Sequence, residues 1–347
     1  MKLNVVSPSD LLHVRNLVDT CWAGLRHKKL FITGGTGFVG KWLLETLVYV
    51  NREMDLQCEA TVLSRDPEHF RCSSPHLAYA PGISLLLGDV RNFDFPDTPI
   101  DMVIHGAVDI AVSGTPLDVL DTCVGGTRHV LEFAAHSGAK DFLLLSSGAI
   151  YGSQPTDLAA LSESWYGAPN PLGAGAAYGT GKRVAECLAV QAGLEQAMRI
   201  KIARCFAFVG PYLPMDKHFA IGNFIRDALR GQAITIQGDG TPLRSYLYAA
   251  DLAAWLWTIL LRGEDGVAYN VGGDEVVSIA ELAQIVNRAL NTDVSVVCKT
   301  TSIPSRAPER YLPDLGKARR DLGLQPRIGL LDAIQRTAQW VSAEDAV

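Results

Sequence analysis

The sequence has no excess of positive charge and no long hydrophobic run. Its 347 residues include 31 Lys and Arg against 37 Asp and Glu, which gives a net charge of −6. A protein that binds the nucleic-acid backbone in general needs a basic surplus, so the composition argues against a nucleic-acid partner. A single anionic ligand, neutralised by a few local Arg and Lys, stays open. The most apolar run, Leu252–Leu261, covers about half of the length that a membrane span needs, so we expect a buried helix and no membrane partner.

Paired cysteines are also missing. The seven cysteines are scattered and form no C-x-x-C pair. An odd, scattered set argues against a disulfide framework and a structural zinc site, and we expect no metal. The first residues, MKLNVVSPSD, lack the apolar core of a signal peptide. Together these absences predict a soluble cytoplasmic protein.

Short apolar runs alternate with helical stretches over the first two thirds of the chain. Strands that are apolar throughout and separated by helices predict a parallel sheet covered on both faces, in an α/β, doubly wound Rossmann arrangement. The expected strands are Leu30–Thr33, Ala60–Leu63, Ile83–Leu87, Met102–Ile104, Phe142–Leu145 and Ile200–Ala203, and the expected helices are Val39–Val50, Val119–His136 and Tyr178–Gln191.

The pattern divides the chain into three parts. Residues 1–27 form a helical extension, with one helix from Asp10 to Leu25 capped by Ser9 or Asp10. Residues 28–210 form the cofactor-binding domain, and residues 211–347 a smaller α/β substrate domain, with parts of the two interleaved. The smaller domain is expected to contain helix Phe219–Leu229, strand Ile234–Ile236, a Trp-rich helix, and helix Ser278–Leu290 with a capping box of Ser278 and Glu281. The Gly- and Pro-rich segment Ser153–Ala177 is expected to be a loop that covers a site.

A glycine-rich turn follows the first expected strand. Gly34, Gly37 and Gly40 fall as G-x-x-G-x-x-G between a strand and a helix. In a dinucleotide site the first glycine permits the tight turn, the second lets the backbone approach a pyrophosphate, and the third allows close packing of helix on strand. The N–H groups at Phe38 and Val39, in the first turn of the helix, would then face the phosphates.

The residues after the second strand bear on the choice of cofactor. An acidic residue there would favour NAD, but Ser64 takes the place and Arg65 follows. A hydroxyl and a guanidinium suit a 2′-phosphate, so we expect NADP, with NAD possible. Arg65 could instead be a surface charge or stack on adenine. Asp89 and Val90, after the third strand, are placed to contact adenine, although Asp89 could equally cap its loop.

Tyr178 and Lys182 stand four residues apart on an expected helix and so share one face. A nearby ammonium and a positive nicotinamide are expected to lower the pKa of the phenol. Tyr178 could then exchange a proton with a hydroxyl or ketone while hydride moves to or from the cofactor. Ser147 ends the fifth strand, where it could hydrogen-bond the reacting oxygen.

These residues resemble the extended short-chain dehydrogenase/reductases, in particular the nucleotide-sugar epimerase/dehydratase family. The elements that carry the resemblance are TGGTGFVG at 33–40, GDV at 88–90, IHGA at 104–107, SSGAIYG at 146–152, YGTGK at 178–182, RCFAFVGP at 204–211 and RSYLYAADLA at 244–253. The resemblance implies that Ser147, Tyr178 and Lys182 form the catalytic triad and that Gly106 and Ala107 line the cofactor.

The resemblance also implies a substrate and an assembly. The substrate would be a nucleotide-diphosphate sugar, with Arg244 on the diphosphate, Arg310 assisting and Asn223 near the nucleotide. Either arginine could instead form a surface salt bridge. Family members dimerise through the helices that correspond to 119–136 and 178–192, so a homodimer is implied, unless both faces are covered within the monomer.

The sequence departs from the family pattern at four positions. Dehydratases carry an Asp-Glu pair after the catalytic Thr, and decarboxylases carry a Glu nearby, but Gly148 and Ala149 stand there. Cys123 replaces the usual Asn of N-x-x-G-T, and Ala207 replaces an Asn that binds the diphosphate in many relatives. A thiol cannot supply the hydrogen bonds of an amide, although a proton relay could still run through water.

Three functions remain open from the sequence. The first is an NAD(P)-dependent nucleotide-sugar epimerase or 4-ketoreductase, with hydride transfer at a sugar carbon, expected to be C4, and Tyr178 as acid/base. The second is a dehydratase or decarboxylase that finds its acid elsewhere, for example Glu163. The third is a cofactor-binding protein without turnover, which Cys123 and Ala207 motivate and the intact triad argues against.

Overall fold

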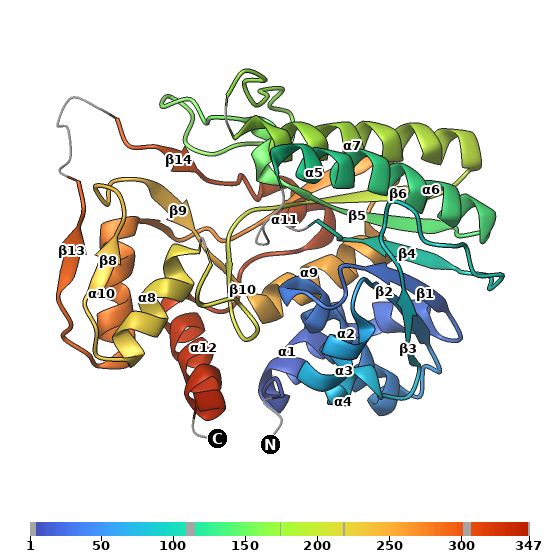
Figure 1. The fold of residues 1–347 in the computed structure, drawn as a ribbon, viewed down its shortest axis with the longest axis horizontal. Helices are drawn as coiled ribbons and strands as arrows, with labels where there is room; N and C mark the ends of the chain where they lie inside the picture. Colours follow the sequence, from blue (N-terminus) through green and yellow to red (C-terminus); the bar gives the residue numbers. More distant parts are fainter. Residues whose placement is uncertain (1–4, 109–114, 174, 218, 301–306, 346–347) are drawn as a thin grey trace.

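The structure is a computed structural model that describes residues 5–108, 115–173, 175–217, 219–300 and 307–345. A seven-stranded sheet in the order β3-β2-β1-β4-β5-β6-β11 lies at its centre, and all its pairs are parallel (Figure 1). The expected doubly wound α/β architecture is confirmed. The strands are β1 (Lys29–Thr33), β2 (Glu59–Ser64), β3 (Ile83–Leu87), β4 (Met102–His105), β5 (Asp141–Ser147), β6 (Arg199–Cys205) and β11 (Val267–Val271).

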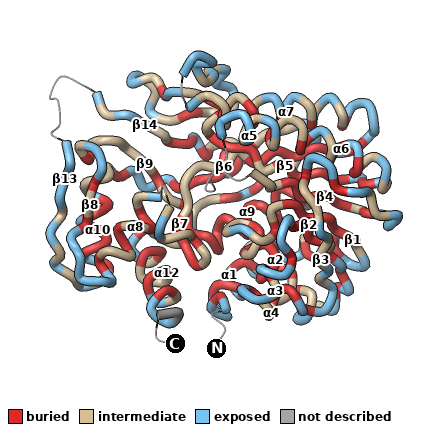
Figure 2. Tube along the Cα trace, viewed as in Figure 1, coloured by how far each residue is buried: buried red, intermediate tan, exposed pale blue. Residues whose placement is uncertain are grey.

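Helices cover both faces of this sheet. One layer holds α5 (Pro116–Asp121), α6 (Thr127–His136) and α7 (Ala176–Gln196), and the other holds α2 (Phe38–Met54) and α9 (Ala249–Arg262). The central strands are buried between these layers (Figure 2). This burial explains why the strands read as continuous apolar runs. Two short helices, α3 (Pro67–Ser73) and α4 (Pro75–Ala78), lie between β2 and β3 in the chain.

Two of the expected helices differ in form. The stretch 119–136 begins earlier, at Pro116, and a π-helical turn at Thr122–Gly126 joins α5 to α6. The single helix Asp10–Leu25 is wrong: α1 spans Pro8–Val18 and a 3₁₀ segment covers Asp19–Leu25.

The cap of α1 is also different from the expectation. Ser7, not Ser9 or Asp10, caps the helix, and Pro8 occupies the first turn, where a proline loses no hydrogen bond. Asp10 is buried instead, and it accepts a hydrogen bond from Tyr248 Oη at 2.7 Å and pairs with Arg336. The N-terminal extension is therefore anchored to two elements from the C-terminal third of the chain.

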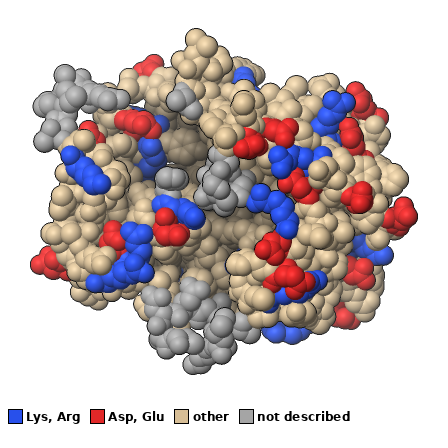
Figure 3. Space-filling view, viewed as in Figure 1, with Lys and Arg blue, Asp and Glu red and all other residues tan. Residues whose placement is uncertain are grey.

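The smaller part of the molecule lies beyond the carboxyl ends of the strands (Figure 1). Its helices are α8 (Ala220–Leu229), α10 (Ile279–Leu290) and α12 (Leu330–Asp345), whereas α11 (Gly316–Leu322) packs on β11 and α9 (Ala249–Arg262). The short strands pair as β7 (Phe208–Val209) with β10 (Leu247–Tyr248), β8 (Ile234–Ile236) with β13 (Val296–Cys298), and β9 (Leu243–Ser245) with both β12 (Val276–Ser278) and β14 (Arg310–Tyr311). Phe219 is the N-cap of α8, and the capping box of Ser278 and Glu281 is present. Figure 3 shows a hollow between the two parts, with Lys and Arg side chains near its rim.

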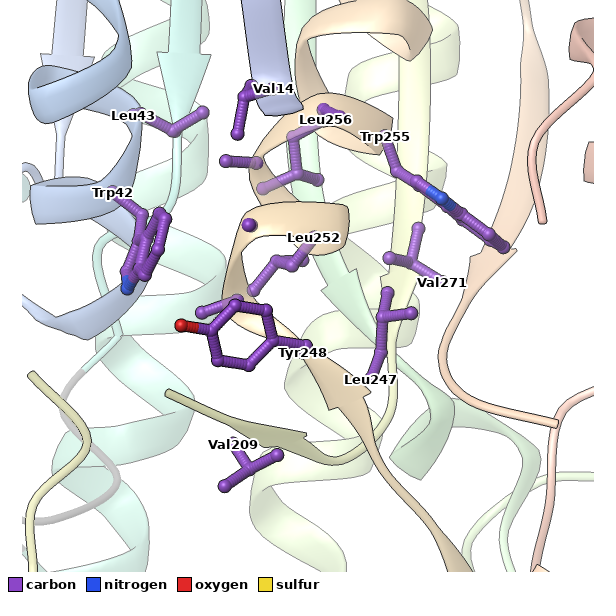
Figure 4. Packing of buried hydrophobic residues seen from close by; sticks show 14 of the residues in the cluster. Val14, Trp42, Leu43, Val209, Leu247, Tyr248, Leu252, Trp255, Leu256 and Val271 are labelled. Atoms are coloured by element: carbon purple, nitrogen blue, oxygen red, sulfur yellow. The ribbon is translucent and has the colours of Figure 1, made fainter. Parts of the chain in front are cut away.

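The largest hydrophobic cluster joins the two parts. Helix α9 is buried along nearly its whole length, and Figure 4 shows its Leu252 beside Tyr248 and on the side of Trp42 of α2, while its Trp255 lies on the other side, near Val271 of β11. Trp42 Nε1 also donates to the carbonyl of Pro211 at 2.9 Å. Helix α9 and strand β11 come after residue 210 in the chain, yet both belong to the large sheet and its covering layer. Among the described residues, no helix is long and apolar enough to span a membrane.

Candidate active site

The glycine turn has the geometry that the sequence pattern predicts. Gly34 has a φ of +73°, and a Cβ there would lie 2.7 Å from the carbonyl carbon of Gly106, so the turn packs against the backbone that follows β4. A Cβ on Gly40 would overlap the carbonyl oxygen of Gly34, which explains the close approach of α2 to the turn. Gly37 is different: it is exposed, and the nearest atom to a Cβ there is 3.5 Å away.

The first turn of α2 offers free backbone donors. Gly37 is its N-cap, no side chain caps it, and Phe38 and Val39 follow. Uncapped N–H groups at a helix N-terminus bind phosphate oxygens. Nearby, the N–H groups of Gly106 and Ala107 both bond Thr33 Oγ1 at 3.2 Å, which fixes the loop after β4 beside the turn. These residues therefore fit the diphosphate of a dinucleotide.

No free carboxylate follows β2. Ser64 is buried and its Oγ accepts from the N–H of Asp66, whose carboxylate caps α3 by accepting from His69 N at 2.9 Å. Arg65 lies close enough to Asp89 for its charge to help lower the pKa of that carboxyl.

The carboxylate of Asp89 is hydrogen-bonded mainly to Arg91. Its carboxylate accepts from the backbone N–H and from the guanidinium of Arg91, and the guanidinium bond is the main cause of the lowered pKa of Asp89. Asp89 thus closes its own loop, and the neighbouring Val90 is buried against Gly126. The contact of Asp89 and Val90 with adenine remains a prediction.

Ser147, Tyr178 and Lys182 meet at the carboxyl end of β5. Ser147 is the last residue of β5, and its hydroxyl lies near enough to Tyr178 to affect the pKa of that phenol. Lys182, one helical turn after Tyr178, is buried, and its Nζ donates to the carbonyl of Leu145 at 2.7 Å. The strand and helix therefore bring together the three residues that were expected to act together.

Burial determines the protonation of this cluster in the protein without a cofactor. Burial raises the pKa of Tyr178 to about 12, and the nearby Ser147 hydroxyl offsets this only in part. Burial also lowers the pKa of Lys182. Because burial is the largest influence on this pKa, Tyr178 is a neutral phenol near pH 7 in this structure.

Two thiols and a histidine lie around Lys182. Cys123, in the π turn, packs against Gly181, where a Cβ would lie 2.7 Å from Cys123 Cβ, and burial raises its pKa. Cys205, which also carries a pKa raised by burial, is paired with Ser147 across β5 and β6. All seven cysteines of the chain are free thiols.

His105 is the last residue of β4 and lies near Lys182. Its Nδ1 is 2.7 Å from Thr33 Oγ1 and its Nε2 3.0 Å from Thr127 Oγ1. Burial lowers the pKa of His105 to about 3, so its ring is neutral. With both ring nitrogens occupied, His105 braces β1, β4 and α6.

The space around Gly148 is closed by two aromatic rings. A Cβ at this position would lie 2.7 Å from both Phe206 Cζ and Tyr311 Oη. The two rings are packed with their centroids 4.7 Å apart. The position where family dehydratases carry an acid therefore has neither a carboxylate nor room for one.

Sequence reasoning missed both of these rings. Phe206 follows β6 within the motif RCFAFVGP, and its place at a strand's carboxyl end was a usable signal. Tyr311 carries no local signal, because it reaches the site only through the pairing of β14 with β9.

The three residues proposed to bind the substrate, Arg244, Arg310 and Asn223, do not lie together. Arg244 lies opposite Tyr311 across β9 and β14, with its guanidinium 5.8 Å from the ring centroid and 2.6 Å from Glu309. Arg310 is next to Tyr311 and so faces the other way; its Nη1 lies 3.5 Å from the carbonyl of Leu158, and its buried Nε has no hydrogen-bond partner among the residues that the structure describes.

Asn223 is turned toward its own segment. Its Nδ2 donates to the carbonyl of Lys217 at 2.9 Å, and its Oδ1 accepts from Arg226. No described contact joins it to Arg244 or Arg310, so its role toward the nucleotide remains a prediction.

The segment after Gly152 folds over the C-terminal strand β14. Leu161 bridges Pro313, and its N–H donates to the carbonyl of Leu312 at 2.8 Å. Glu163 accepts from the backbone N–H of Asn270 at 2.8 Å, and burial raises its pKa. This carboxyl supports β11 and has no described contact with Tyr178, which weakens it as a replacement acid.

Comparison with known proteins decides the family. The family model described as "NAD dependent epimerase/dehydratase family" matches residues 30–272. The chain belongs to the NAD-dependent epimerase/dehydratase family. It is 30% identical over 309 residues to UDP-glucuronic acid decarboxylase 6 of Arabidopsis thaliana, covering 88% of this chain and 86% of that one. It is 29% identical to UDP-glucuronic acid decarboxylase 1 of Danio rerio, covering 91% and 73%.

Solved structures of the same fold include enzymes of different activity. dTDP-glucose 4,6-dehydratase DesIV from Streptomyces venezuelae, solved with NAD and TYD, matches with a TM-score of 0.77 and 25% identity, over 92% of this chain and 98% of that one. UDP-glucuronic acid 4-epimerase from Bacillus cereus, solved with UDP-glucuronic acid and NAD, matches with a TM-score of 0.75 and 23% identity, over 91% and 99%. This epimerase/dehydratase family member is thus an extended short-chain dehydrogenase/reductase.

The described residues of this family member hold no cluster of three or more His, Cys, Asp or Glu side chains arranged to bind a metal. Its polar chemistry is concentrated at Ser147, Tyr178 and Lys182, beside a glycine turn that fits a dinucleotide. The cluster of Ser147, Tyr178 and Lys182 and the glycine turn are therefore the basis of the proposed function.

Proposed function

We propose that this enzyme reduces the keto group at C4 of a nucleotide-diphosphate sugar, with 4-epimerisation as the related reaction at the same site. The observation that supports this most is the neutral Tyr178, near Ser147 and one helical turn before Lys182, at a site without an acid at positions 148 and 149. Reduction of a ketone needs one proton donor at the oxygen, whereas elimination of water needs an additional acid or base at carbon and leaving group.

Tyr178 and Ser147 are proposed to act on the same oxygen atom of the sugar. When bound, a nicotinamide cofactor supplies the hydride. Tyr178 Oη gives its proton to the sugar oxygen, and Ser147 donates a hydrogen bond to that same oxygen. Lys182, held by the carbonyl of Leu145, places an ammonium near the phenolate that Tyr178 becomes, which lowers the cost of that charge.

For the cofactor we propose a preference for NADP(H). The end of β2 carries Ser64 and Arg65, and the nearest carboxylate, Asp66, is used as the cap of α3. A guanidinium there binds a 2′-phosphate. Loss of one charge-assisted contact is worth about 1.5–3 kcal/mol, so Arg65→Ala should weaken NADPH binding by roughly 10- to 150-fold and leave NADH almost unchanged. Equal effects on both cofactors in fluorescence titrations would refute this preference.

Decarboxylation of UDP-glucuronic acid is the second candidate, because the curated relatives named above are UDP-glucuronic acid decarboxylases. Oxidation at C4 of a uronic acid yields a β-keto acid, which loses carbon dioxide readily. The missing acids at Gly148 and Ala149 therefore weigh less against decarboxylation than against dehydration. This candidate predicts a pentose product and carbon dioxide.

A product assay separates these activities. The purified enzyme is incubated with NADH or NADPH and one of three substrates: UDP-glucuronic acid, UDP-glucose, or a dTDP-4-keto-6-deoxy sugar. We expect NADPH oxidation with the keto sugar. Inversion of UDP-glucose at C4 would identify the enzyme as an epimerase, and release of carbon dioxide from UDP-glucuronic acid would identify it as a decarboxylase. Loss of water from a substrate would refute the proposal. Tyr178→Phe should abolish turnover while cofactor binding survives; full activity of this variant would also refute it.

We also propose a homodimer formed through the outer faces of α5 and α7. Large apolar side chains are exposed there: Leu117 on α5, and Val184 and Leu194 on α7. Sedimentation of the wild type and of Leu194→Glu would test this, with a monomeric variant expected and a monomeric wild type refuting the proposal.

A further inference from the structure

A cavity of about 480 Å³ lies at the amino ends of the central strands. Its walls come mainly from the first residues of β4, β5 and β6, the residue before β1 and the last turn of α9. Asp141 begins β5 and lines this cavity, whereas Ser147 ends the same strand, about 20 Å away at the rise of a parallel strand. Ligands of doubly wound sheets bind at the carboxyl ends of the strands, so the cavity is separate from the proposed cofactor and substrate sites.

The lining of this cavity is positively charged, although the chain as a whole has a net charge of −6. Two carboxylates, Asp101 and Asp141, stand against five cations. The cations are Lys28, Lys140, Arg199, Lys201 and Arg262. The lining therefore has an excess of three positive charges, which is opposite in sign to the protein as a whole.

Both carboxylates of the lining are already paired. Asp101 accepts a hydrogen bond from Lys28 Nζ at 2.9 Å. Asp141 is shared by Arg199, whose Nε donates at 2.8 Å, and by Lys201, whose side chain is buried. One carboxylate neutralises one cation, so the pair of Arg199 and Lys201 keeps one positive charge, and the lining has no carboxylate left for its other two cations.

Those two cations, Lys140 and Arg262, are available to a ligand. Neither side chain makes a hydrogen bond or an ion pair with any residue in the part of the chain that the structure describes, and both are exposed. The backbone of Lys140 is held on both sides, since its N–H donates to the carbonyl of Asp101 and its carbonyl accepts from the N–H of Arg199. An ammonium and a guanidinium on fixed backbone are the groups with which proteins bind phosphate.

Two negative groups outside the lining reduce the excess charge but do not cancel it. Asp265 lies close enough to Arg199 to help raise the pKa of that guanidinium, and its Oδ1 accepts from the N–H of Ile200 at 2.8 Å. The carboxyl end of α9 adds the equivalent of about half a negative charge. With Asp265 it offsets about one and a half of the three charges, so the cavity stays positive and attracts an anion.

The rest of the lining is apolar. Met102 and Leu260 are buried core residues that also line the cavity, and Leu261 lies beside them at the end of α9. Pockets for small organic ligands have volumes of roughly 300–1,000 Å³ and combine apolar walls with a few charged groups. The cavity meets both conditions, so its size and walls suit an organic anion better than an inorganic ion.

We propose that this cavity is a second ligand site, which binds a small organic diphosphate such as a nucleoside diphosphate. The phosphates lie against Lys140 and Arg262, and the organic part lies against Met102 and Leu261. The site goes beyond the proposed function, because it uses none of the residues that are assigned to the cofactor, the substrate or the reaction.

The test is isothermal titration calorimetry with ADP as the probe. Wild type is compared with the double variant Lys140→Ala, Arg262→Ala, and with a control, Arg230→Ala, Lys299→Ala, which removes the same two charges from exposed positions outside the cavity. The cavity variant should bind ADP at this site at least about tenfold more weakly, so that one ADP per chain is lost from the titration, whereas the control should match wild type. Both variants should keep the wild-type melting temperature, because Lys140 and Arg262 hold no other part of the fold.

Two further titrations locate the bound ADP and test its charge. Gly37→Ala alters the glycine turn and should keep the ADP that the cavity variant loses. Adenosine, which has no phosphate, should bind the cavity far more weakly than ADP. The proposal is overturned if the cavity variant titrates like wild type, if Gly37→Ala loses all binding of ADP, or if adenosine binds as tightly as ADP.

Discussion

The substitution Gly148→Ala tests the closed space beside Ser147, the proposed catalytic serine. The added Cβ would lie 2.7 Å from Tyr311 Oη and from Phe206 Cζ, whereas ordinary contacts begin at 3.4 Å. At least one ring therefore has to move by several tenths of an ångström. Because the rings pack on each other at 4.7 Å, moving one displaces the other.

The size of the effect follows from this displacement. Overpacking of a buried site costs about 1–3 kcal/mol, so we expect the free energy of unfolding to fall by that amount. Because the displaced rings lie against position 148, which follows Ser147 in the chain, kcat should also fall, and a tenfold fall corresponds to about 1.4 kcal/mol. Cofactor affinity should not change, because the glycine turn is not involved.

Urea unfolding and steady-state kinetics measure the two effects separately. Gly238→Ala is the matched control, since a Cβ there meets nothing within 4 Å. We expect the control to behave like the wild type in both assays. If Gly148→Ala kept wild-type stability and wild-type kcat, the placement of Phe206 and Tyr311 around this position would be wrong.

Two further predictions concern parts outside the reacting cluster. Gly37→Ala should fold normally and lose cofactor affinity in titrations, whereas Gly40→Ala should lose both stability and affinity because its Cβ overlaps the backbone of the glycine turn; equal unfolding midpoints for the two variants would contradict this. Asp141→Ala leaves Lys201 buried without its charge partner, which should cost about 3–5 kcal/mol in urea unfolding at pH 7. Burial alone would raise the pKa of Asp141, but Arg199 and Lys201 hold it below 3.8, so this contribution is present above pH 3.8 and is lost as the pH falls through the lower folded value. The wild type should therefore lose more stability than the variant below pH 4, and parallel acid unfolding curves would refute the reasoning.

Much of the large domain is determined by local sequence. The apolar strands could be placed to within one or two residues at most ends because they are buried on both faces, and the glycine spacing is dictated by steric limits at Gly34 and Gly40. The pairing of Tyr178 with Lys182 follows from helix periodicity, and their meeting with Ser147 follows from the rule that ligands bind at the carboxyl ends of parallel strands.

Errors arose where a distant residue overrides a local preference. Asp10 is a reasonable helix cap by sequence, but Tyr248 and Arg336 bind its carboxylate, and Ser7 takes the capping position. The lowered pKa of Tyr178 was predicted for a site that also holds a positive nicotinamide, and it stays a prediction; in the protein alone, burial raises this pKa. Neither burial nor a distant partner can be read from a segment of sequence alone.

The sequence by itself determined a doubly wound sheet, a dinucleotide turn and a Ser-Tyr-Lys cluster, because each depends on spacing within one strand or helix. Only the tertiary structure decided what surrounds that cluster. Tyr311 and Phe206 lie beside Gly148 because β14 pairs with β9 and because β6 ends next to β5. Contacts of this kind join segments far apart in the chain, and the packing that selects them exists only once the whole chain has folded.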